Sequence, residues 1–287
     1  MYFRRRSAIA ERPETRRDQM RNAATSNSAA AVWTGMVPVE DTALAVTDTG
    51  GTGRPVIYLN GSYADQKHWR PVVAELGPEY RHITYDERAR GKSKRSADYS
   101  FAGCLRDIDA VLAARGVERP ILVGWSYGAT LAAHWAQQNP DRAAGVVAVD
   151  GAMPYGLTGE EGQERIRKLF HRMRFVLPVA RPLGLAAGMS AAEHAEINIE
   201  INELAAAMTP ILQQVTCPMR YVLATGSNLG GGEEEMEAAR ASLDPVLAAN
   251  PKLKVSAKVA SNHSHILRKD FRAVAAAVRE TAAASSR

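Results

Sequence analysis

After about residue 36, the chain alternates short apolar segments with longer segments whose apolar residues recur at helical spacing. The short segments are rich in β-branched and aromatic residues, which is typical of strands. The pattern predicts strands at 37–47, 56–59, 82–85, 121–125, 146–149, 219–224 and 253–259. It predicts helices at 69–76, 100–115, 127–139 and 268–284. Strands that alternate with helices usually pair in parallel, so we expect an α/β protein with helices on both faces of a mostly parallel sheet.

The alternation stops between about residues 160 and 215, where helical patterns continue without a convincing strand. We therefore expect a helical lid at 152–216, inserted after the sixth strand, between core segments at 36–151 and 217–287. Open α/β sheets bind ligands at the carboxyl ends of their strands, so the lid should cover that edge.

Residues 1–35 are polar and show no lasting periodicity, which predicts a disordered basic extension. The extension carries +4 of the net charge of +5 of the 287-residue chain, so the body is close to neutral. The basic balance is therefore weak evidence for a nucleic-acid partner. Met36, where the regular pattern begins, is an alternative natural start.

The composition, with 46% hydrophobic and 23% charged residues, is that of an ordinary globular protein. No segment approaches the apolar run of a membrane span, and the N-terminus lacks the apolar core of a signal peptide. Two cysteines, Cys104 and Cys217, are too few for a disulfide framework, and no metal-ligand spacing surrounds them. We expect a cytoplasmic protein with a small-molecule substrate and no nucleic-acid or membrane partner, and leave a homodimer open.

Residues 124–128, Gly-Trp-Ser-Tyr-Gly, follow a buried apolar segment and precede a predicted helix. A serine on a sharp strand-to-helix turn projects its hydroxyl above the sheet, and the crowded backbone requires glycine two residues to either side. The helix directs its free N–H groups and positive dipole end toward the same point. The pattern predicts Ser126 as a nucleophile and the N–H group of Tyr127 as an oxyanion donor.

Residues 37–284 resemble the α/β-hydrolase superfamily, in its branch of small lidded esterases, lactonases and carbon–carbon hydrolases. Besides 124–128, three segments are similar to family motifs. Tyr-Leu-Asn-Gly-Ser at 58–62 resembles the strand that ends in His-Gly-x, and Asp-Glu-Arg-Ala-Arg-Gly-Lys-Ser at 86–93 resembles the D-x-R-x-x-G-x-S turn. Asn-His-Ser-His-Ile-Leu-Arg at 262–268 resembles the histidine loop. The resemblance implies a mainly eight-stranded sheet, a Ser–His–acid triad, and no metal or organic cofactor.

In this family the residue after the His-Gly pair supplies the second oxyanion N–H group, which implies Ser62 here. Asn60 stands where histidine is usual, and we expect this change to be tolerated because the position mainly shapes the loop. The base must follow the last strand, where only His263 and His265 lie. His263 fits the family spacing, and His265 is the alternative. The other histidines expected on the surface or on helix faces are His82, His134, His171 and His194.

The third member of the triad has two candidate positions. The usual family site is a G-x-x-D turn after the strand at 219–224, but this chain has Gly-Ser-Asn-Leu at 226–229. Some family members carry the acid at the end of the sixth strand, where this chain has Asp150, although many relatives have a non-catalytic aspartate there. We favour Asp150. The alternative is a group of acids that also suits the start of a helix: Glu233, Glu234 and Glu235.

Two further patterns have ordinary structural interpretations. Gly-Lys-Ser at 91–93 lacks the earlier glycine of a phosphate loop, and indicates a structural turn with Asp86 and Arg88 pairing across it. The basic segment 165–174 has apolar residues at helical spacing, which predicts an amphipathic lid helix with a solvated face. Attraction of an anionic substrate is the alternative for this segment.

These residues together predict a serine hydrolase that cleaves a small-molecule ester, thioester or lactone through an acyl-enzyme. Its triad would be Ser126, His263 and Asp150. A serine at the nucleophile position argues against the relatives that use aspartate there, the epoxide hydrolases and haloalkane dehalogenases. Two alternatives stay open: carbon–carbon bond hydrolysis or perhydrolysis on the same triad, and a receptor that kept the fold and lost turnover.

Overall fold

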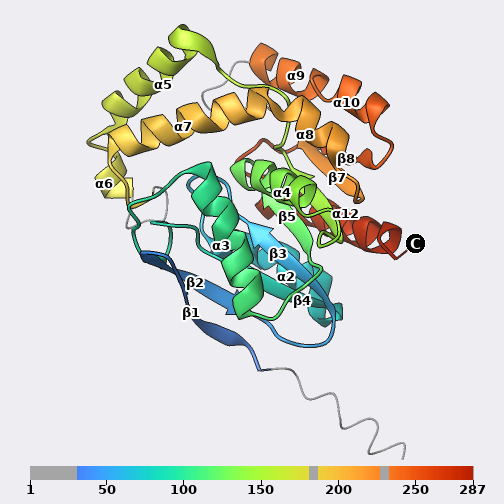
Figure 1. Cartoon of the computed structure of the whole chain (residues 1–287). Coiled ribbons are helices and arrows are strands. Elements are labelled where there is room, and N and C mark those ends of the chain that lie inside the picture. Colours follow the sequence, from blue (N-terminus) through green and yellow to red (C-terminus); the bar gives the residue numbers. More distant parts are fainter. Residues whose placement is uncertain (1–30, 181–186, 227–232, 287) are drawn as a thin grey trace, which may run out of the picture.

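The computed structural model describes residues 31–180, 187–226 and 233–286, arranged as Figure 1 shows. An eight-stranded sheet runs through the molecule in the order β1-β2-β4-β3-β5-β6-β7-β8. All pairs from β4 to β8 are parallel, and β1 and β2 are antiparallel to their neighbours. The mostly parallel α/β sheet expected from the sequence is therefore confirmed. The strands are β1 (Trp33–Val39), β2 (Thr42–Asp48), β3 (Arg54–Leu59), β4 (Tyr80–Tyr85), β5 (Ile121–Trp125), β6 (Gly145–Val149), β7 (Met219–Ala224) and β8 (Leu253–Val259).

The N-terminal part of the sheet differs from the expectation of a single strand at 37–47. β1 and β2 form a hairpin whose turn includes Glu40, with φ of 50°. The hairpin begins at Trp33, so residues 33–35 belong to the sheet rather than to the predicted extension. β1 is an edge strand with alternately exposed side chains, so its hydrophobic pattern is weak. Residues 1–30 of that extension lie outside the described part of the chain.

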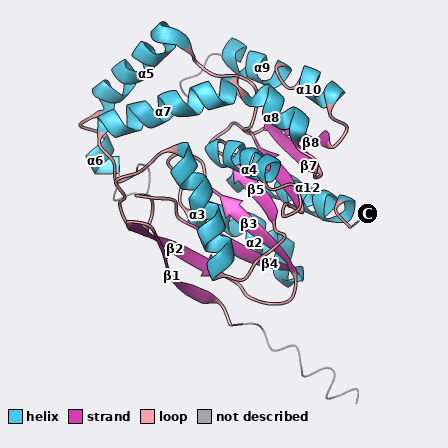
Figure 2. Ribbon diagram, viewed as in Figure 1, coloured by secondary structure: helices cyan, strands magenta, loops and turns pink. Residues whose placement is uncertain are grey.

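Helices cover both faces of the sheet (Figure 2). α2 (Arg70–Leu76) and α12 (Phe271–Ala284) pack on one face, where Val56 and Tyr58 point. Ile57 and Leu59 point to the other face, because successive strand residues alternate. The helices on that face are α3 (Phe101–Ala114), α4 (Tyr127–Gln138), α8 (Met208–Gln214) and α10 (Asp244–Ala249). The remaining short elements are η1 (Gln66–Trp69), η2 (Gly77–Glu79), α9 (Glu233–Ala241) and α11 (Ile266–Lys269).

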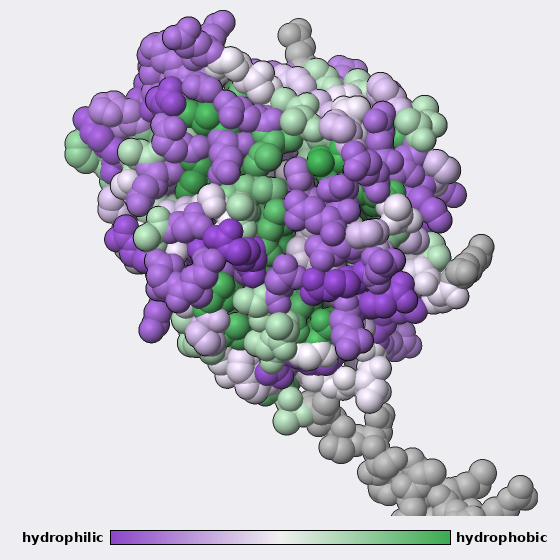
Figure 3. Space-filling view, viewed as in Figure 1, coloured by the Kyte–Doolittle hydropathy of each residue, from purple (hydrophilic) through white to green (hydrophobic). Residues whose placement is uncertain are grey.

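Between β6 and β7 the described residues form helices and no strand, as the sequence predicts. α5 (Gly159–Met173) and α7 (Ala191–Ala206) lie at the top of Figure 1, and the short α6 (Leu177–Ala180) lies at the left below them. α8 joins the main core. α5 and α7 share a small apolar cluster that includes Ile166 and Phe170. The outer surface around α5 is largely hydrophilic (Figure 3). Three of its cations pair with glutamates, so α5 is an amphipathic helix with a solvated charged face.

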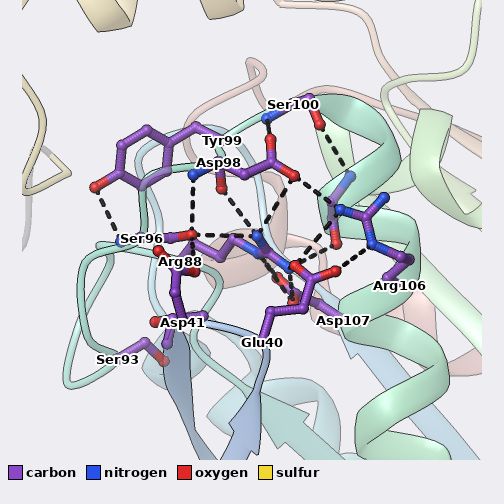
Figure 4. A network of polar contacts seen from close by, with 12 residues as sticks. Glu40, Asp41, Arg88, Ser93, Ser96, Asp98, Tyr99, Ser100, Arg106 and Asp107 are labelled. Atoms are coloured by element: carbon purple, nitrogen blue, oxygen red, sulfur yellow. Dashed lines mark hydrogen bonds and ion pairs between the residues drawn. The ribbon is translucent and has the colours of Figure 1, made fainter.

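A buried polar network joins the hairpin to α3 (Figure 4). Arg88 is fully buried and forms a two-point ion pair with Asp107, at 2.8 Å from Nε to Oδ2 and 2.9 Å from Nη2 to Oδ1. Its Nη2 also binds Glu40 at 2.9 Å. The predicted pair between Asp86 and Arg88 is wrong. Asp86 instead accepts hydrogen bonds from the backbone N–H groups of Gln66 and Lys92, each at 2.8 Å. Asp86 and Arg88 therefore bind different residues and do not pair with each other.

Candidate active site

Each residue of the predicted site follows the carboxyl end of a parallel strand. Ser62 follows β3, Ser126 follows β5, Asp150 follows β6 and His263 follows β8. Because these strands run parallel and lie within one sheet, their carboxyl ends meet at one edge. The fold therefore brings together residues that are up to about 200 positions apart in the chain.

The turn after β5 holds Ser126 in a conformation that few non-glycine residues adopt, with φ of 55° and ψ of −118°. Its N–H group donates to the carbonyl of Val149 at 2.9 Å. A Cβ atom on Gly124 would lie 2.1 Å from the carbonyl oxygen of Gly128. A Cβ atom on Gly128 would lie 2.1 Å from the carbonyl oxygen of Leu59. The close backbone approaches explain why the turn needs both glycines.

The Asp150 carboxylate joins the end of β6 to the loop after β8. Its Oδ2 lies 2.7 Å from Nδ1 of His263, and its Oδ1 accepts the backbone N–H group of Ala224 at 3.0 Å. Asp150 is 1% exposed, whereas the imidazole of His263 is 26% exposed. A hydrogen bond at Nδ1 fixes the orientation of the imidazole ring.

The alternative acids and base take other positions. Glu235 pairs with Arg165 of α5, at 2.9 Å between Oε1 and Nη1. The side chains of Glu233 and Glu234 lie outside what the structure describes. His265 is the residue before α11, and its backbone N–H group donates to the side chain of Asn262 at 3.1 Å. Of the candidates described, Asp150 and His263 are the pair brought into contact.

Two backbone N–H groups are available where the sequence predicts an oxyanion hole. Tyr127 is the first residue of α4, so its N–H group has no acceptor within the helix. The N–H group of Ser62 has no acceptor among the residues of the described ranges. Gly61 lies against the indole of Trp125. A Cβ atom added to Gly61 would lie 3.1 Å from Cε3 of that indole. The loop after β3 therefore packs directly on the turn that carries Ser126.

The sequence interpretation missed the side chains that hold this loop. Glu87 accepts two hydrogen bonds from Asn60, one from the backbone N–H group at 2.8 Å and one from Nδ2 at 2.7 Å. Arg90 donates from Nε to the carbonyl of Ser62 at 2.6 Å. Both residues occupy variable positions of the D-x-R-x-x-G-x-S turn, so the motif carries no signal for them. Their burial, at 1% and 4% exposure, is the signal, and it requires the structure.

Tyr63, next to Ser62, connects the same loop to the inserted helices. Its hydroxyl accepts a hydrogen bond from Nδ2 of Asn198 on α7 at 2.9 Å. Its ring lies 6.4 Å from that of Phe170 on α5 and 5.5 Å from that of His194. Burial raises the pKa of Tyr63 to about 12, so its hydroxyl stays protonated at neutral pH. The inserted helices thus directly contact the loop after β3, residues 60–63, called the oxyanion loop below because of its predicted role.

The expectation that the remaining histidines lie on the surface is wrong for one residue. His82 is buried in β4, with Tyr58 at 2.8 Å from Nδ1 and the carbonyl of Gly77 at 2.9 Å from Nε2. His134 and His194 lie on helices, as expected, but both are buried. Within the described ranges, no cluster of three His, Cys, Asp or Glu side chains is arranged to bind a metal ion. No helix there is long and apolar enough to span a membrane.

Comparisons with known proteins identify the fold that this sheet order and this site belong to. A family model described as "alpha/beta hydrolase fold" matches residues 54–182. Solved structures with this architecture match most of the chain. The chain therefore has the α/β-hydrolase fold.

The individual proteins that match this chain share its fold but have low sequence identity to it. A haloalkane dehalogenase of Mesorhizobium japonicum is 28% identical over 140 residues, which is 48% of this chain and 45% of the relative. An esterase of Exiguobacterium antarcticum has a TM-score of 0.68 at 18% identity, covering 87% of this chain and 99% of that chain. A thermophilic esterase of Thermogutta terrifontis has a TM-score of 0.66 at 21% identity, covering 88% and 97%. The chain spans less than half the length of the curated relatives it matches.

Proposed function

We propose that this protein is a serine hydrolase that cleaves a small-molecule ester, thioester or lactone through an acyl-enzyme. The observation that carries the proposal is the contact of Asp150 with Nδ1 of His263 at the sheet edge where Ser126 occupies its strained turn. The indole of Trp125, the residue before Ser126, has its ring centroid 5.5 Å from that of His263. This contact supports a shared site for the serine and the imidazole.

In the proposed reaction, Oγ of Ser126 attacks the carbonyl carbon while Nε2 of His263 takes the hydroxyl proton. The negative oxygen accepts hydrogen bonds from the N–H groups of Ser62 and Tyr127. Asp150 stabilises the imidazolium through Nδ1. The leaving group departs with the proton from Nε2. Water then gives a proton to His263 and attacks the acyl-enzyme, which releases the acid and restores Ser126.

The serine also bears on the similarity to a haloalkane dehalogenase. Displacement of a halide by a carboxylate gives an ester, which water can cleave at its carbonyl group. Displacement by the hydroxyl of Ser126 would give an ether, which this site has no means to hydrolyse. Acyl transfer is therefore the chemistry that suits a serine nucleophile.

We further propose that the segment 152–216 acts as a lid that sets substrate size and limits water access. The contacts of Tyr63 with α5 and α7 support this role, because they connect the inserted helices to the oxyanion loop. A small organic ester is the substrate class that a lidded site would suit.

The proposal is tested with a fluorophosphonate probe, which labels activated serines, and with a chain-length series of p-nitrophenyl esters extended to lactones. We expect labelling and ester turnover in the wild type, and loss of both in Ser126→Ala. The residual rate of that variant should be lower by at least about 10³-fold. Absence of labelling in a folded wild-type protein would contradict the proposal and favour a non-catalytic receptor.

A further inference from the structure

The turn after β4 carries a carboxylate that the proposed mechanism does not use. Glu87 is 1% exposed and makes no ion pair within 4.0 Å among the residues that the structure describes. A buried carboxylate is costly unless an opposite charge or hydrogen bonds offset its desolvation. Arg90, on the same turn, offsets part of this cost, and a hydrogen-bonding partner offsets a further part. That partner is Asn60, at the end of β3 and two residues before Ser62.

Both polar atoms of the Asn60 side chain form hydrogen bonds. Its Nδ2 donates to Oε2 of Glu87 and to the carbonyl of Tyr85, both at 2.7 Å. Its Oδ1 accepts from Nε1 of Trp69 at 2.8 Å. Its backbone N–H group donates to Oε1 of Glu87 at 2.8 Å. The Glu87 contacts therefore fix both the side chain and the main chain at the start of the oxyanion loop.

The chemistry of these contacts requires a carboxylate. Two donors of Asn60 converge on Glu87, one on each oxygen, and an ionised carboxylate is the side chain that accepts at both atoms. A glutamine would offer one acceptor and turn an N–H donor toward an N–H donor. The position of Glu87 is thus specific for charge and not only for shape.

The far end of the loop is held from the same turn. Nε of Arg90 donates to the carbonyl of Ser62 at 2.6 Å, and Nη1 donates to the carbonyl of Arg88 at 3.2 Å. The turn after β4 therefore forms hydrogen bonds with the loop after β3 at Asn60 and at Ser62, on either side of Gly61. Arg90 approaches the carbonyl of Ser62 and leaves the N–H group of that residue free.

We propose that Glu87 is a positioning residue for the oxyanion hole: through Asn60 it holds the loop after β3 so that the N–H group of Ser62 meets the developing oxyanion. This inference rests on the proposed function. Asn60 stands where the family usually has histidine, and its carboxamide supplies the donor that Glu87 requires. Small displacements of an oxyanion donor cost rate because the hydrogen bond strengthens only in the transition state.

The ionisation of Glu87 gives this role a measurable signature. Burial raises its pKa to about 7, against the lowering effects of Arg90 and of the Asn60 hydrogen bonds. The ionisable groups that face it are Arg90 on its own turn, Tyr85 on β4 and Cys104 on α3. The pKa values of Tyr85 and Cys104 are raised by burial first and by Glu87 as well, so neither ionises near neutral pH. Loss of activity as the pH falls through about 7 should therefore include protonation of Glu87.

The test compares wild type with Glu87→Gln, using a p-nitrophenyl ester and the labelling rate of the fluorophosphonate probe. We expect Glu87→Gln to lower kcat by about tenfold to a hundredfold with little change in KM, which is below the effect of deleting a donor outright. The acidic limb of the kcat/KM profile should lose the step near pH 7 that belongs to Glu87, while the limb of the catalytic base remains. Glu75→Gln, a carboxylate on the outer part of α2, is the matched control and should leave kcat unchanged.

A second pair of variants covers the case in which Glu87→Gln does not fold. Asn60→His keeps a ring donor for Glu87 and should retain most of kcat, whereas Asn60→Ala removes the donor and should lower kcat like Glu87→Gln. Wild-type kcat and pH profile in a folded Glu87→Gln, or equal kcat in the two Asn60 variants, would overturn the inference. If wild type is neither labelled nor active, the proposed function itself fails, which is a different result.

Discussion

Two regions of the molecule bury a carboxylate against a basic side chain, and they do so in different ways. Behind the hairpin, Asp107 and Arg88 are both fully buried, and every guanidinium nitrogen of Arg88 has an acceptor (Figure 4). At the edge of the sheet where the parallel strands end, Asp150 is buried but its partner His263 is 26% exposed. A guanidinium keeps its charge at physiological pH, whereas an imidazole is a side chain that can take up and release a proton.

The difference is the one expected between a structural ion pair and the reactive pair that we propose. Burial opposes the charge of Arg88, but the hydrogen bonds to Asp107 and Glu40 outweigh this effect and raise its pKa. A site that transfers protons needs the opposite: a partner whose charge changes and one nitrogen left for the substrate. A pair whose cation keeps its charge therefore indicates stability in one region, and a pair with an imidazole, whose charge can change, suits proton transfer in the other.

The largest effect is expected from Asp150→Asn, which keeps the shape of the reactive pair and removes its charge. The amide would favour the wrong imidazole tautomer, so kcat should fall by about 10³- to 10⁴-fold while thermal unfolding changes little. The measurement is ester turnover beside a melting curve. Glu235→Gln is the control, because Glu235 pairs with Arg165, and it should retain kcat. Full turnover in Asp150→Asn would show that Asp150 is not the triad acid.

Arg88→Met should give the reverse outcome in the structural region. Removing the guanidinium leaves Asp107 buried without its cation, which should lower the free energy of unfolding by about 3–5 kcal/mol. The kcat of the remaining folded enzyme should stay near the wild-type value. Urea denaturation measures the loss, and Arg106→Met is the control because Arg106 is half exposed and should cost at most about 1 kcal/mol. A drop in kcat with unchanged stability would reverse the assignment of the two regions.

The sequence predicts the strands inside the sheet better than the hairpin at its N-terminal edge. The strands at 121–125 and 219–224 match the structure to the residue, since strands inside a parallel sheet are usually continuous apolar segments. The strand at 253–259 also matches, although β8 forms the opposite edge of the sheet and is only partly buried. The edge hairpin was missed because β1 is half exposed and its alternation is weak.

Within the candidate site, the local motif was predicted from the sequence, and the contacts between distant segments were not. The turn of Ser126 is local, and its glycines mark it in the sequence. The contact of His263 with Asp150 joins residues 113 positions apart, so the sequence left Asp150 and the glutamates as alternatives. Glu87 and Asn60 are 27 positions apart and belong to different motifs, and no spacing rule connects them. Contacts between loops depend on sheet order, which a single sequence does not contain.

The smallest of these effects is expected at Asp48, a second structural carboxylate, at the end of β2. Its side chain is fully buried and binds Arg81 at 2.7 Å and Arg115 at 2.8 Å. Burial opposes its ionisation, but these arginines and the N–H group of Gly50 lower its pKa to about 2, from 3.8. A lowered pKa means that the charged form stabilises the fold, by about 2 kcal/mol above pH 4, and that this contribution is lost as the pH falls toward 2.

Asp48→Asn should therefore lower the free energy of unfolding by about 2 kcal/mol at pH 7, and the difference from wild type should shrink steadily below pH 4. Chemical denaturation at a series of pH values measures it. Asp109→Asn is the control, because Asp109 is half exposed and should change stability by less than about 1 kcal/mol. A difference between Asp48→Asn and wild type that stays constant down to pH 2 would mean that shape, and not charge, makes Asp48 structural. The contrast between the two regions would then rest on Arg88 alone.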